Sequence, residues 1–391
     1  MTSLSPQRIY LDANASAPLC REARDAMTTC LQDGAGNPSS VHAEGRAGRS
    51  ALARARRQVV SAIDGASGDL VFTSSASEAN NLALKGVAFG TPRDGRRALI
   101  TTAAEHPSVL APLRWLSGLD YDLMLDVLPV DGAGRVTLER LSRRIGEETL
   151  LVSVIVANNE TGAVSAVQEI SQLVHGAGAL LHVDAAQALG RIPVSVQDWQ
   201  ADLVTFSSHK TGGPRGAGAL WIRKGLGLEP IHHGGHQERN RRGGTESLLT
   251  CVGFGAACEA ANARRSEMGD RVGPLRDSLW RGIADRFASA QRLSPVDACL
   301  PNTLLAAFPG VQGEALLMGL DMEGIAVSTG SACTAGSLEP SHVLLAMGVE
   351  PELAASAVRF SLGLHTTEAE IDRSRTASAD DDDDDDDDDD G

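Results

Sequence analysis

The sequence predicts an α/β protein with a mainly parallel sheet and a second, smaller α+β domain. Through the first two thirds of the chain, short apolar segments typical of buried strands alternate with segments of helical spacing. From about Cys251 the pattern changes to longer helical segments with few strands between them. The length of 391 residues also favours two domains over one.

Composition excludes several classes of function. The net charge of −16 is dominated by eleven consecutive aspartates, Asp380 to Asp390, and removing these eleven charges leaves −5. A mildly acidic body without a basic patch argues against binding to nucleic acid or to an anionic membrane surface. No apolar run approaches the ~20 residues that span a bilayer, and we expect no signal peptide before the first strand.

Six cysteines are scattered along the chain without any Cys-x-x-Cys pair: Cys20, Cys30, Cys251, Cys258, Cys299 and Cys333. This spacing argues against both a zinc site and a disulfide framework. We therefore expect a cytoplasmic protein with no resident metal ion.

Alternating strands and helices can be assigned along most of the chain. The expected strands are 9–12, 70–73, 98–102, 149–156, 180–184, 203–206, 219–222, 303–308 and 326–328. The expected helices are 21–31, 45–62, a helix directly after Ser74 and Ser75, one after Pro107, and 167–175, 252–268, 276–287, 313–322 and 341–347.

Polar side chains follow the ends of several expected strands. They are Ser77, His106, Asn159, Asp184, Gln187 and Lys210. In open parallel sheets, ligands bind at the carboxyl ends of the strands. The sequence therefore predicts one ligand site that contains these residues.

Lys210 lies between an apolar strand and a glycine-rich segment, where a lysine can form a Schiff base with an aldehyde cofactor. A lysine beside glycines is also common in ordinary turns. Asp184 ends the preceding strand, and a carboxylate there could keep a pyridine nitrogen protonated. Ser74 to Ser77 open a helix directly after a strand, which is typical of a phosphate site as well as of a simple helix cap.

The chain resembles the fold-type I, class V aminotransferase-like enzymes that use pyridoxal phosphate, and more narrowly the cysteine desulfurases of the NifS/IscS group. The resemblance covers residues 8–372 and rests on eleven motifs: Tyr10 to Ala15, Gly36-Asn37-Pro38, Thr73 to Glu78, Glu105-His106-Pro107, Asn158 to Gly162, His182 to Gln187, Ser208-His209-Lys210, Gly234 to Glu238, Arg242 to Glu246, Gly330 to Cys333 and Arg359 to Gly363.

This resemblance implies a large pyridoxal-phosphate domain with a seven-stranded sheet at 15–255, a small domain from 1–14 and 256–372, and a disordered acidic tail at 373–391. It also implies a homodimer and L-cysteine as substrate. The residues of two motifs, Asn158 to Gly162 and Gly234 to Glu238, resemble the nitrogen-fixation branch of the group.

The resemblance also assigns roles to individual residues. Lys210 would bind the aldehyde, Asp184 the ring nitrogen, and Gln187 the phenolic oxygen with Asn159 nearby. The phosphate would be held by Ala76, Ser77, Ser207 and His209, and by Thr245 of the neighbouring subunit. His106 would stack on the ring and carry protons, Arg359 would bind the substrate carboxylate, and Asn14 and Asn159 would line the substrate pocket.

Cys333 separates this reaction from others of the superfamily. It lies in a long segment of small residues, in which the resemblance implies that its thiolate takes sulfur from L-cysteine as a persulfide, leaving L-alanine. The sulfur would pass to an iron–sulfur scaffold protein or another thiol acceptor. No resident metal is implied, although Cys333 would be able to hold a transferred iron–sulfur cluster transiently.

Two other functions remain open from the sequence. One is another enzyme of the superfamily, a selenocysteine lyase or an aminotransferase. The other is a truncated, inactive paralogue that acts as a binding subunit, because after Asp372 the aspartate-rich segment replaces the amphipathic helix expected in relatives.

Overall fold

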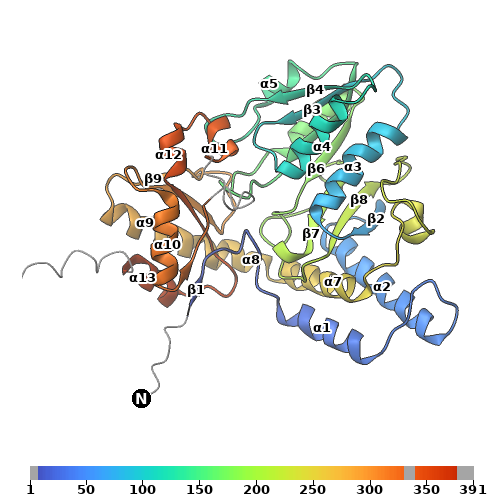
Figure 1. The fold of residues 1–391 in the computed structure, drawn as a ribbon, viewed down its shortest axis with the longest axis horizontal. Helices are drawn as coiled ribbons and strands as arrows, with labels where there is room; N and C mark the ends of the chain where they lie inside the picture. Colours follow the sequence, from blue (N-terminus) through green and yellow to red (C-terminus); the bar gives the residue numbers. More distant parts are fainter. Residues whose placement is uncertain (1–7, 330–339, 377–391) are drawn as a thin grey trace, which may run out of the picture.

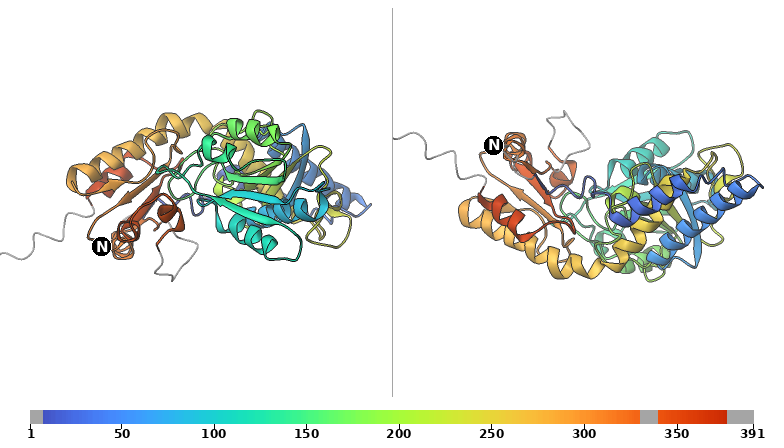
Figure 2. Two further views of the ribbon diagram at one scale, coloured as in Figure 1. Left: turned by 90° about the horizontal axis from the view of Figure 1, so that it is seen from above. Right: turned by 90° about the horizontal axis from the view of Figure 1, so that it is seen from below.

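The chain folds into two lobes of unequal size, the larger around a seven-stranded sheet and the smaller around a three-stranded and a two-stranded sheet (Figure 1). The computed structural model describes residues 8–329 and 340–376. Figure 2 shows the same two lobes from two further sides. Within the described residues, no helix is both long and apolar enough to cross a bilayer.

The larger lobe contains a seven-stranded sheet that is mainly parallel, as expected. In spatial order its strands are β2 (Gly68–Thr73), β8 (Gly218–Arg223), β7 (Leu203–Ser207), β6 (Leu180–Asp184), β5 (Thr149–Ile155), β3 (Ala98–Thr102) and β4 (Met124–Leu128). β8 runs antiparallel to both of its neighbours, whereas all other pairs are parallel. The carboxyl ends of β3, β5, β6 and β7 therefore share one edge.

Helices cover both faces of this sheet. α3 (Ala76–Gly90) and α4 (Pro107–Ser117) pack on one face, and α2 (Ala43–Ala62), α6 (Val167–Gly176) and α7 (Leu248–Ala263) pack on the other. α1 (Arg21–Gln32) packs against α7. Burial on both faces explains why all seven residues of β5 are apolar or small, and all are buried. The lobe also contains α5 (Leu138–Ser142) and the short 3₁₀ helices η1 (Ser208–Lys210) and η2 (Gln237–Asn240).

The smaller lobe joins the two ends of the chain. β10 (Thr303–Ala307) lies between β12 (Ala357–Ser361) and β9 (Gln291–Arg292), antiparallel to both, and β1 (Ile9–Tyr10) pairs in parallel with β11 (Ile325–Ala326). Its helices are α8 (Arg265–Glu267), the π-helical turn η3 (Met268–Val272), α9 (Gly273–Arg286), α10 (Gly313–Met322), α11 (His342–Ala346), α12 (Pro351–Ala355) and α13 (Glu368–Thr376).

Some sequence-based boundaries need correction. The helix expected at 252–268 ends at Ala263, because Arg264 leaves the helical conformation before α8 begins. The strand expected at 9–12 extends only over Ile9–Tyr10. Residues 373–376 belong to α13, which packs against α9, and not to the tail; the remaining tail, 377–391, lies outside the described residues. β4, β9 and β12 have no counterpart in the expected list of strands.

Acid should destabilise the larger lobe through His182. This side chain is fully buried in β6, with Nδ1 2.8 Å from the Ser153 hydroxyl and Nε2 3.1 Å from the Thr205 hydroxyl. Burial lowers the pKa of His182 from 6.5 to about 4. The unfolded chain therefore binds this proton more readily than the folded chain, so stability falls as pH drops from about 6.5 to about 4.

We expect His182→Gln to reduce the difference in unfolding free energy between pH 7 and pH 4.5 by about 2–3 kcal/mol. Denaturant unfolding at the two pH values measures this difference for both proteins. An equal loss of stability in the variant would show that other groups cause the acid sensitivity.

Candidate active site

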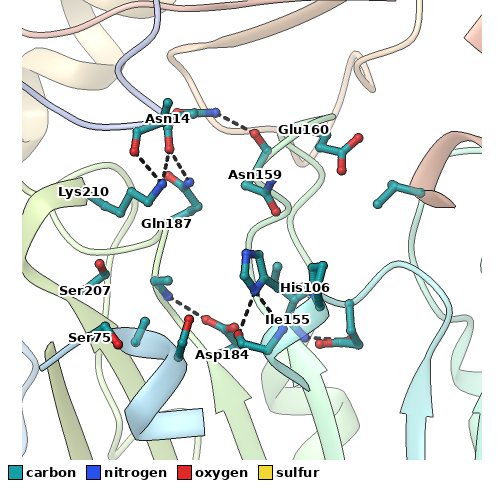
Figure 3. Close-up of a pocket in the computed structure, with 18 of the residues that line it drawn as sticks. Asn14, Ser75, His106, Ile155, Asn159, Glu160, Asp184, Gln187, Ser207 and Lys210 are labelled. Atoms are coloured by element: carbon teal, nitrogen blue, oxygen red, sulfur yellow. Dashed lines mark hydrogen bonds between the residues drawn. The ribbon is translucent and has the colours of Figure 1, made fainter. Parts of the chain in front are cut away.

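A pocket of about 420 Å³ lies at the carboxyl ends of β5, β6 and β7, where the small lobe meets the large one (Figure 3). It brings together most of the residues that the sequence predicted: Asn14, Ala76, Ser77, His106, Asn159, Asp184, Gln187, Ser207, His209, Lys210 and Arg359. Segments from residue 14 to residue 359 therefore converge on one cavity. Nowhere among the described residues do three or more His, Cys, Asp or Glu side chains gather in a way that could hold a metal ion.

Lys210 ends the short helix η1 and points its amine toward the loop after β1. Its Nζ donates to the carbonyl oxygens of Asn14 at 2.5 Å and Ala15 at 2.8 Å. The carbonyl of Lys210 accepts a hydrogen bond of 3.1 Å from the buried Arg191, which also binds the carbonyl of Ala13. The lysine is thus held by its backbone, while its amine lies in the pocket.

Asp184 ends β6 and is 2% exposed. Its Oδ2 accepts a hydrogen bond of 2.8 Å from Asn80 Nδ2, and its Oδ1 accepts one of 3.0 Å from the main-chain N–H of Ala186. Both carboxylate oxygens therefore act as hydrogen-bond acceptors. A buried carboxylate of this kind suits a protonated ring nitrogen.

Serine hydroxyls and main-chain N–H groups gather at the N-terminus of α3. Ser75 caps this 15-residue helix by accepting from Glu78 N at 3.1 Å, and it lines the pocket with Ala76 and Ser77. Helix N-termini attract anions because their N–H groups and dipole point outward. β8 approaches so closely that a Cβ at Gly218 would lie 2.4 Å from the carbonyl carbon of Ser75, so glycine is needed there.

His209 closes this anion site from η1. Burial, with Lys210 and Arg215 nearby, lowers the pKa of His209 from 6.5 to about 4. Its Nδ1 lies 3.3 Å from the Ser16 hydroxyl. At neutral pH a neutral His209 can offer an N–H to an anion without carrying a charge itself.

The chemistry of these groups fits pyridoxal phosphate. The pocket offers a primary amine for an aldehyde, a buried carboxylate for a pyridinium nitrogen, and an anion site at a helix N-terminus. Figure 3 shows Lys210, Gln187 and Asn14 together at one end of the pocket and Asp184 with His106 at the other. Such a separation leaves room for a ring between the amine and the carboxylate.

His106 begins α4 and is held by the first turn of that helix. Its Nδ1 lies 3.0 Å from the main-chain N–H of Ser108 and 2.7 Å from the Ser108 hydroxyl. Burial lowers the pKa of His106, and nearby Lys210 and His342 act in the same direction. The imidazole is therefore neutral at physiological pH.

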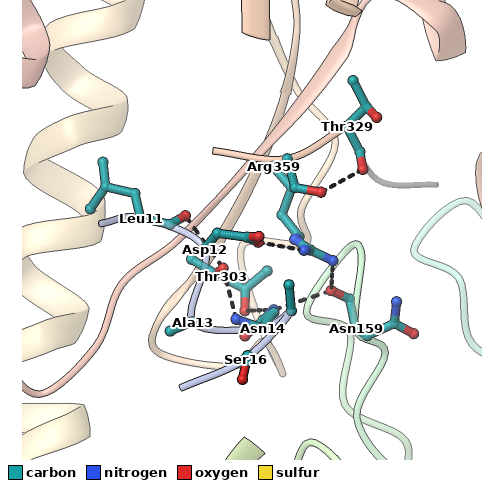
Figure 4. A network of polar contacts seen from close by, with 12 residues as sticks. Leu11, Asp12, Ala13, Asn14, Ser16, Asn159, Thr303, Thr329 and Arg359 are labelled. Atoms are coloured by element: carbon teal, nitrogen blue, oxygen red, sulfur yellow. Dashed lines mark hydrogen bonds and ion pairs between the residues drawn. The ribbon is translucent and has the colours of Figure 1, made fainter. Parts of the chain in front are cut away.

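Arg359 lies on β12 and reaches the pocket from the small lobe (Figure 4). It is 2% exposed, with Nη2 2.7 Å from the Asp12 carboxylate and Nη1 donating to the carbonyl of Asn159 at 2.9 Å. Its Nε has no hydrogen-bond partner among residues 8–329 and 340–376. Arg359 lines the pocket, and a guanidinium can bind a carboxylate through two hydrogen bonds.

One predicted site residue of the described chain does not line the pocket, and another lies outside the described residues. Thr245 is exposed between η2 and α7 and does not line the cavity. Cys333, the proposed sulfur acceptor, lies outside the described residues.

The sequence reasoning missed three acidic or basic side chains that line the pocket: Glu105, Glu160 and His342. Glu105 is fully buried and accepts from the Thr102 hydroxyl at 2.7 Å and Ile155 N at 2.9 Å, and burial raises its pKa to about 8. Glu160 accepts a hydrogen bond from Ser341 beside it. Glu105 precedes His106 and Glu160 follows Asn159, and this adjacency could have suggested that both line the pocket. How deeply they are buried cannot be deduced from their spacing in the sequence.

Known proteins resemble this chain along nearly its whole length. Residues 9–373 match the family model described as aminotransferase class-V. A cysteine desulfurase IscS of Dictyoglomus turgidum is 41% identical, with 94% of this chain and 92% of the relative covered. A cysteine desulfurase of Cereibacter sphaeroides is 43% identical, with 94% of each covered.

A solved structure described as a NifS-like protein superposes with a TM-score of 0.88, at 35% identity, covering 95% of this chain and 99% of the other. This similarity extends over the whole fold. The chain belongs to the class-V aminotransferase family and, within it, to the pyridoxal-phosphate-dependent cysteine desulfurases of the NifS/IscS group.

Proposed function

We propose that this pocket converts L-cysteine to L-alanine and that the removed sulfur passes to Cys333 as a persulfide. The observation that carries the proposal is that the amine of Lys210, the carboxylate of Asp184 and the guanidinium of Arg359 line one cavity. An amino acid substrate needs an aldehyde for its amine and a cation for its carboxylate. Lys210 and Asp184 would hold a cofactor that carries the aldehyde, and Arg359 would supply the cation.

Pyridoxal phosphate, when bound, supplies an aldehyde for the substrate amine and a ring that withdraws electrons from the adjacent carbon. Lys210 would hold the aldehyde and Asp184 the ring nitrogen, with Gln187 and Asn159 beside the phenolic oxygen. Ala76, Ser77, Ser207 and His209 would hold the phosphate, supported by their position around the N-terminus of α3.

Arg359 would orient the substrate, with Asn14 and Asn159 forming the wall of the pocket next to it. Asp12 and the Asn159 carbonyl each take one bond from the two Nη atoms, so the five-donor guanidinium would keep further N–H groups for the substrate carboxylate. Lys210, once released from the aldehyde, would remove the proton from the substrate's α-carbon. His106 would stack on the ring and carry protons between it and the product.

Sulfur transfer requires a thiolate near the substrate. The Cys333 thiolate would attack the sulfur of L-cysteine, forming an S–S bond as the C–S bond breaks. The electron pair of that bond stays with carbon, which takes up a proton and leaves as alanine.

The five described cysteines are poorly suited to this step: Cys20, Cys30, Cys251, Cys258 and Cys299. Burial raises the pKa of each, to about 12 for Cys251, and none lines the pocket. A thiol with a raised pKa is seldom a thiolate at neutral pH, so it is a poor nucleophile. This supports Cys333 as the acceptor.

The enzyme would act as a homodimer in which Thr245 reaches the phosphate site of the partner. Support comes from the exposure of Thr245 and from its absence from the pocket of its own chain. The persulfide would pass to an iron–sulfur scaffold or another thiol acceptor, and Cys333 would hold a transferred cluster only transiently. A role in nitrogen fixation belongs to the same proposal.

We also propose the division into a large domain at 15–255 and a small domain from 1–14 and 256–372, with these bounds moved to the ends of α7 at Ala263 and of α13 at Thr376. It is supported by separate buried cores, one around the seven-stranded sheet and one that joins Ile9 and Leu11 to β10 and β12. The free cysteines of the described part of the chain support a cytoplasmic location.

The proposal is tested by incubating the purified protein with L-cysteine and measuring alanine and sulfide, with candidate acceptor proteins added one at a time. We expect equal amounts of alanine and of sulfur, the latter bound or released. Alanine from selenocysteine alone, or transamination without sulfur release, would indicate the other enzymes of the superfamily. No turnover and no bound cofactor would indicate an inactive binding subunit.

Replacing Arg359 by lysine should weaken substrate binding. Lysine keeps the charge but cannot bond Asp12, the Asn159 carbonyl and a carboxylate from one planar group. We expect kcat/KM for L-cysteine to fall roughly tenfold to a hundredfold, mainly through a higher KM. Steady-state kinetics of alanine formation measures this, and an unchanged KM would exclude Arg359 as the carboxylate ligand.

A further inference from the structure

A row of hydrogen bonds connects His106 to Asp184 behind the pocket wall. Asn80 Nδ2 lies 2.8 Å from Asp184 Oδ2 and 2.9 Å from the Ser108 hydroxyl oxygen. The same hydroxyl lies 2.7 Å from His106 Nδ1. We call these four residues, Asp184, Asn80, Ser108 and His106, the Asn80 row.

Three elements that pack together build this row. Asn80 lies on α3, Ser108 and His106 lie at the start of α4, and Asp184 ends β6. α3 and α4 share one hydrophobic core on the same face of the sheet. Asn80 is fully buried and does not line the pocket, so it acts only through its neighbours.

The charge of Asp184 determines the direction of the first hydrogen bond. Asp184 already accepts from Ala186 N, and an ionised carboxylate can only accept. Asn80 must therefore turn its amide NH₂, and not its carbonyl, toward Asp184. Its second N–H then points to the Ser108 hydroxyl, which accepts it.

The remaining bonds follow from this first one. Because the Ser108 oxygen accepts from Asn80, its own proton is available for His106 Nδ1. The main-chain N–H of Ser108, which can only donate, points to the same nitrogen at 3.0 Å. Nδ1 is thus an acceptor, and the proton of the neutral imidazole lies on Nε2.

The buried amide oxygen of Asn80 supports this direction. Oδ1 has no hydrogen-bond partner in the described part of the chain. Buried polar atoms are rarely left unpaired, because an unmade hydrogen bond is costly there. The amide forgoes its acceptor bond while keeping two donor bonds, which indicates that donation to Asp184 and Ser108 is what this position requires.

We propose that Asn80 and Ser108 are positioning residues that use the negative charge of Asp184 to hold His106 as its Nε2-protonated tautomer. Asp184 would bind the ring nitrogen of the cofactor, and His106 would stack on the cofactor ring. The amide of Asn80 would then orient both side chains. In this tautomer His106 offers an N–H at Nε2 and cannot accept a proton there. Of Lys210 and His106, Lys210 is then the base that removes the proton from the α-carbon of the substrate. This refinement rests on the proposed roles of His106 and Asp184.

The surroundings of His106 favour the neutral ring. Lys210 from η1 and His342 from α11 both oppose a positive charge on it, and Asp184 from β6 alone favours one. Burial, the largest cause, acts in the same direction as Lys210 and His342, so the pKa of His106 lies below its ordinary value.

The tautomer can be measured without any turnover. We would label the histidines of the holoenzyme with ¹⁵N, record the two ring-nitrogen shifts of each, and assign His106 from the spectrum of His106→Gln. With only ten histidines in the chain, the signals are few. We expect an unprotonated Nδ1 and a protonated Nε2 at pH 7. A proton on Nδ1, or on both nitrogens, would overturn the proposal.

Kinetics provide the second measurement. Asn80→Ala and Ser108→Ala should each lower kcat for alanine formation by roughly tenfold to a hundredfold, with KM changed less than about threefold. Both should also shift the ring-nitrogen signals of His106 toward a partly populated second tautomer, because Nδ1 then depends on the main-chain N–H of Ser108 without the ordered hydroxyl. Ser108→Thr, which keeps the hydroxyl, should resemble the wild type. If Asn80→Ala does not fold, the two Ser108 variants make the same comparison.

Thr101→Val is the matched control, because Thr101 donates a buried hydrogen bond of 2.9 Å to the Ser153 carbonyl outside the Asn80 row. Row variants that match this control in both kcat and tautomer would refute the proposal. Absence of alanine from the wild type would instead refute the proposed function, and the tautomer measurement would still decide the role of Asn80.

Discussion

Lys210→Ala should abolish alanine formation from L-cysteine, with a loss of roughly a thousandfold or more. The variant loses the amine that would hold the cofactor's aldehyde and that would also remove the substrate's proton. Its neighbours should keep their places, because the backbone carbonyl of residue 210 is held by Arg191 and does not depend on the side chain. Alanine formation and the visible absorbance of bound cofactor, before and after gel filtration, measure the two losses.

Lys224→Ala is a suitable comparison, because Lys224 is exposed just after β8 and lies away from the pocket. We expect it to retain full activity and cofactor. Should Lys210→Ala keep a covalently bound cofactor and normal turnover, another amine must carry the chemistry and the proposed site would be wrong.

Cys333→Ser should remove sulfur transfer while leaving the cofactor bound. A hydroxyl is far less nucleophilic than a thiolate and cannot form a persulfide, so we expect alanine formation to fall by roughly a hundredfold or more. Alkylation of the protein after incubation with L-cysteine, followed by mass spectrometry, should find a persulfide on Cys333 in the wild type only. Cofactor absorbance should be unchanged in the variant.

Cys30→Ser serves as the control, since Cys30 lies on α1 and does not line the pocket. Its activity and persulfide should equal those of the wild type. Alanine formation that survives in Cys333→Ser would argue against the proposed sulfur transfer and in favour of another reaction of the superfamily.

Local pattern was sufficient to predict much of the large lobe. β5, β6 and β7 are mainly apolar runs with polar residues at or soon after their ends, and this pattern predicted buried parallel strands with a ligand site at their carboxyl ends. Strands with weaker patterns were missed: β4 has only one buried residue, and β9 is two residues long.

Lys210 and Asp184 were identified because a lysine and an aspartate after apolar strands are conspicuous, and Arg359 was identified through the family resemblance. Glu105, Glu160 and His342 were missed. The present partners of Lys210 and Arg359 were missed as well. Arg359 meets Asp12 across 347 positions of the chain, and Lys210 meets Asn14 across 196. Such contacts depend on how the two lobes come together, which no local pattern reports.

The sequence by itself determined the fold class, the family and the groups that would bind the cofactor, since these depend on periodicity and on motifs of adjacent residues. Only the tertiary structure decided how those groups are oriented. Asn80 looked like an ordinary helix residue, yet packing of α3 against α4 and β6 places its amide between Asp184 and Ser108. The direction of those hydrogen bonds follows from a buried carboxylate that can only accept, and burial is a property of the folded chain.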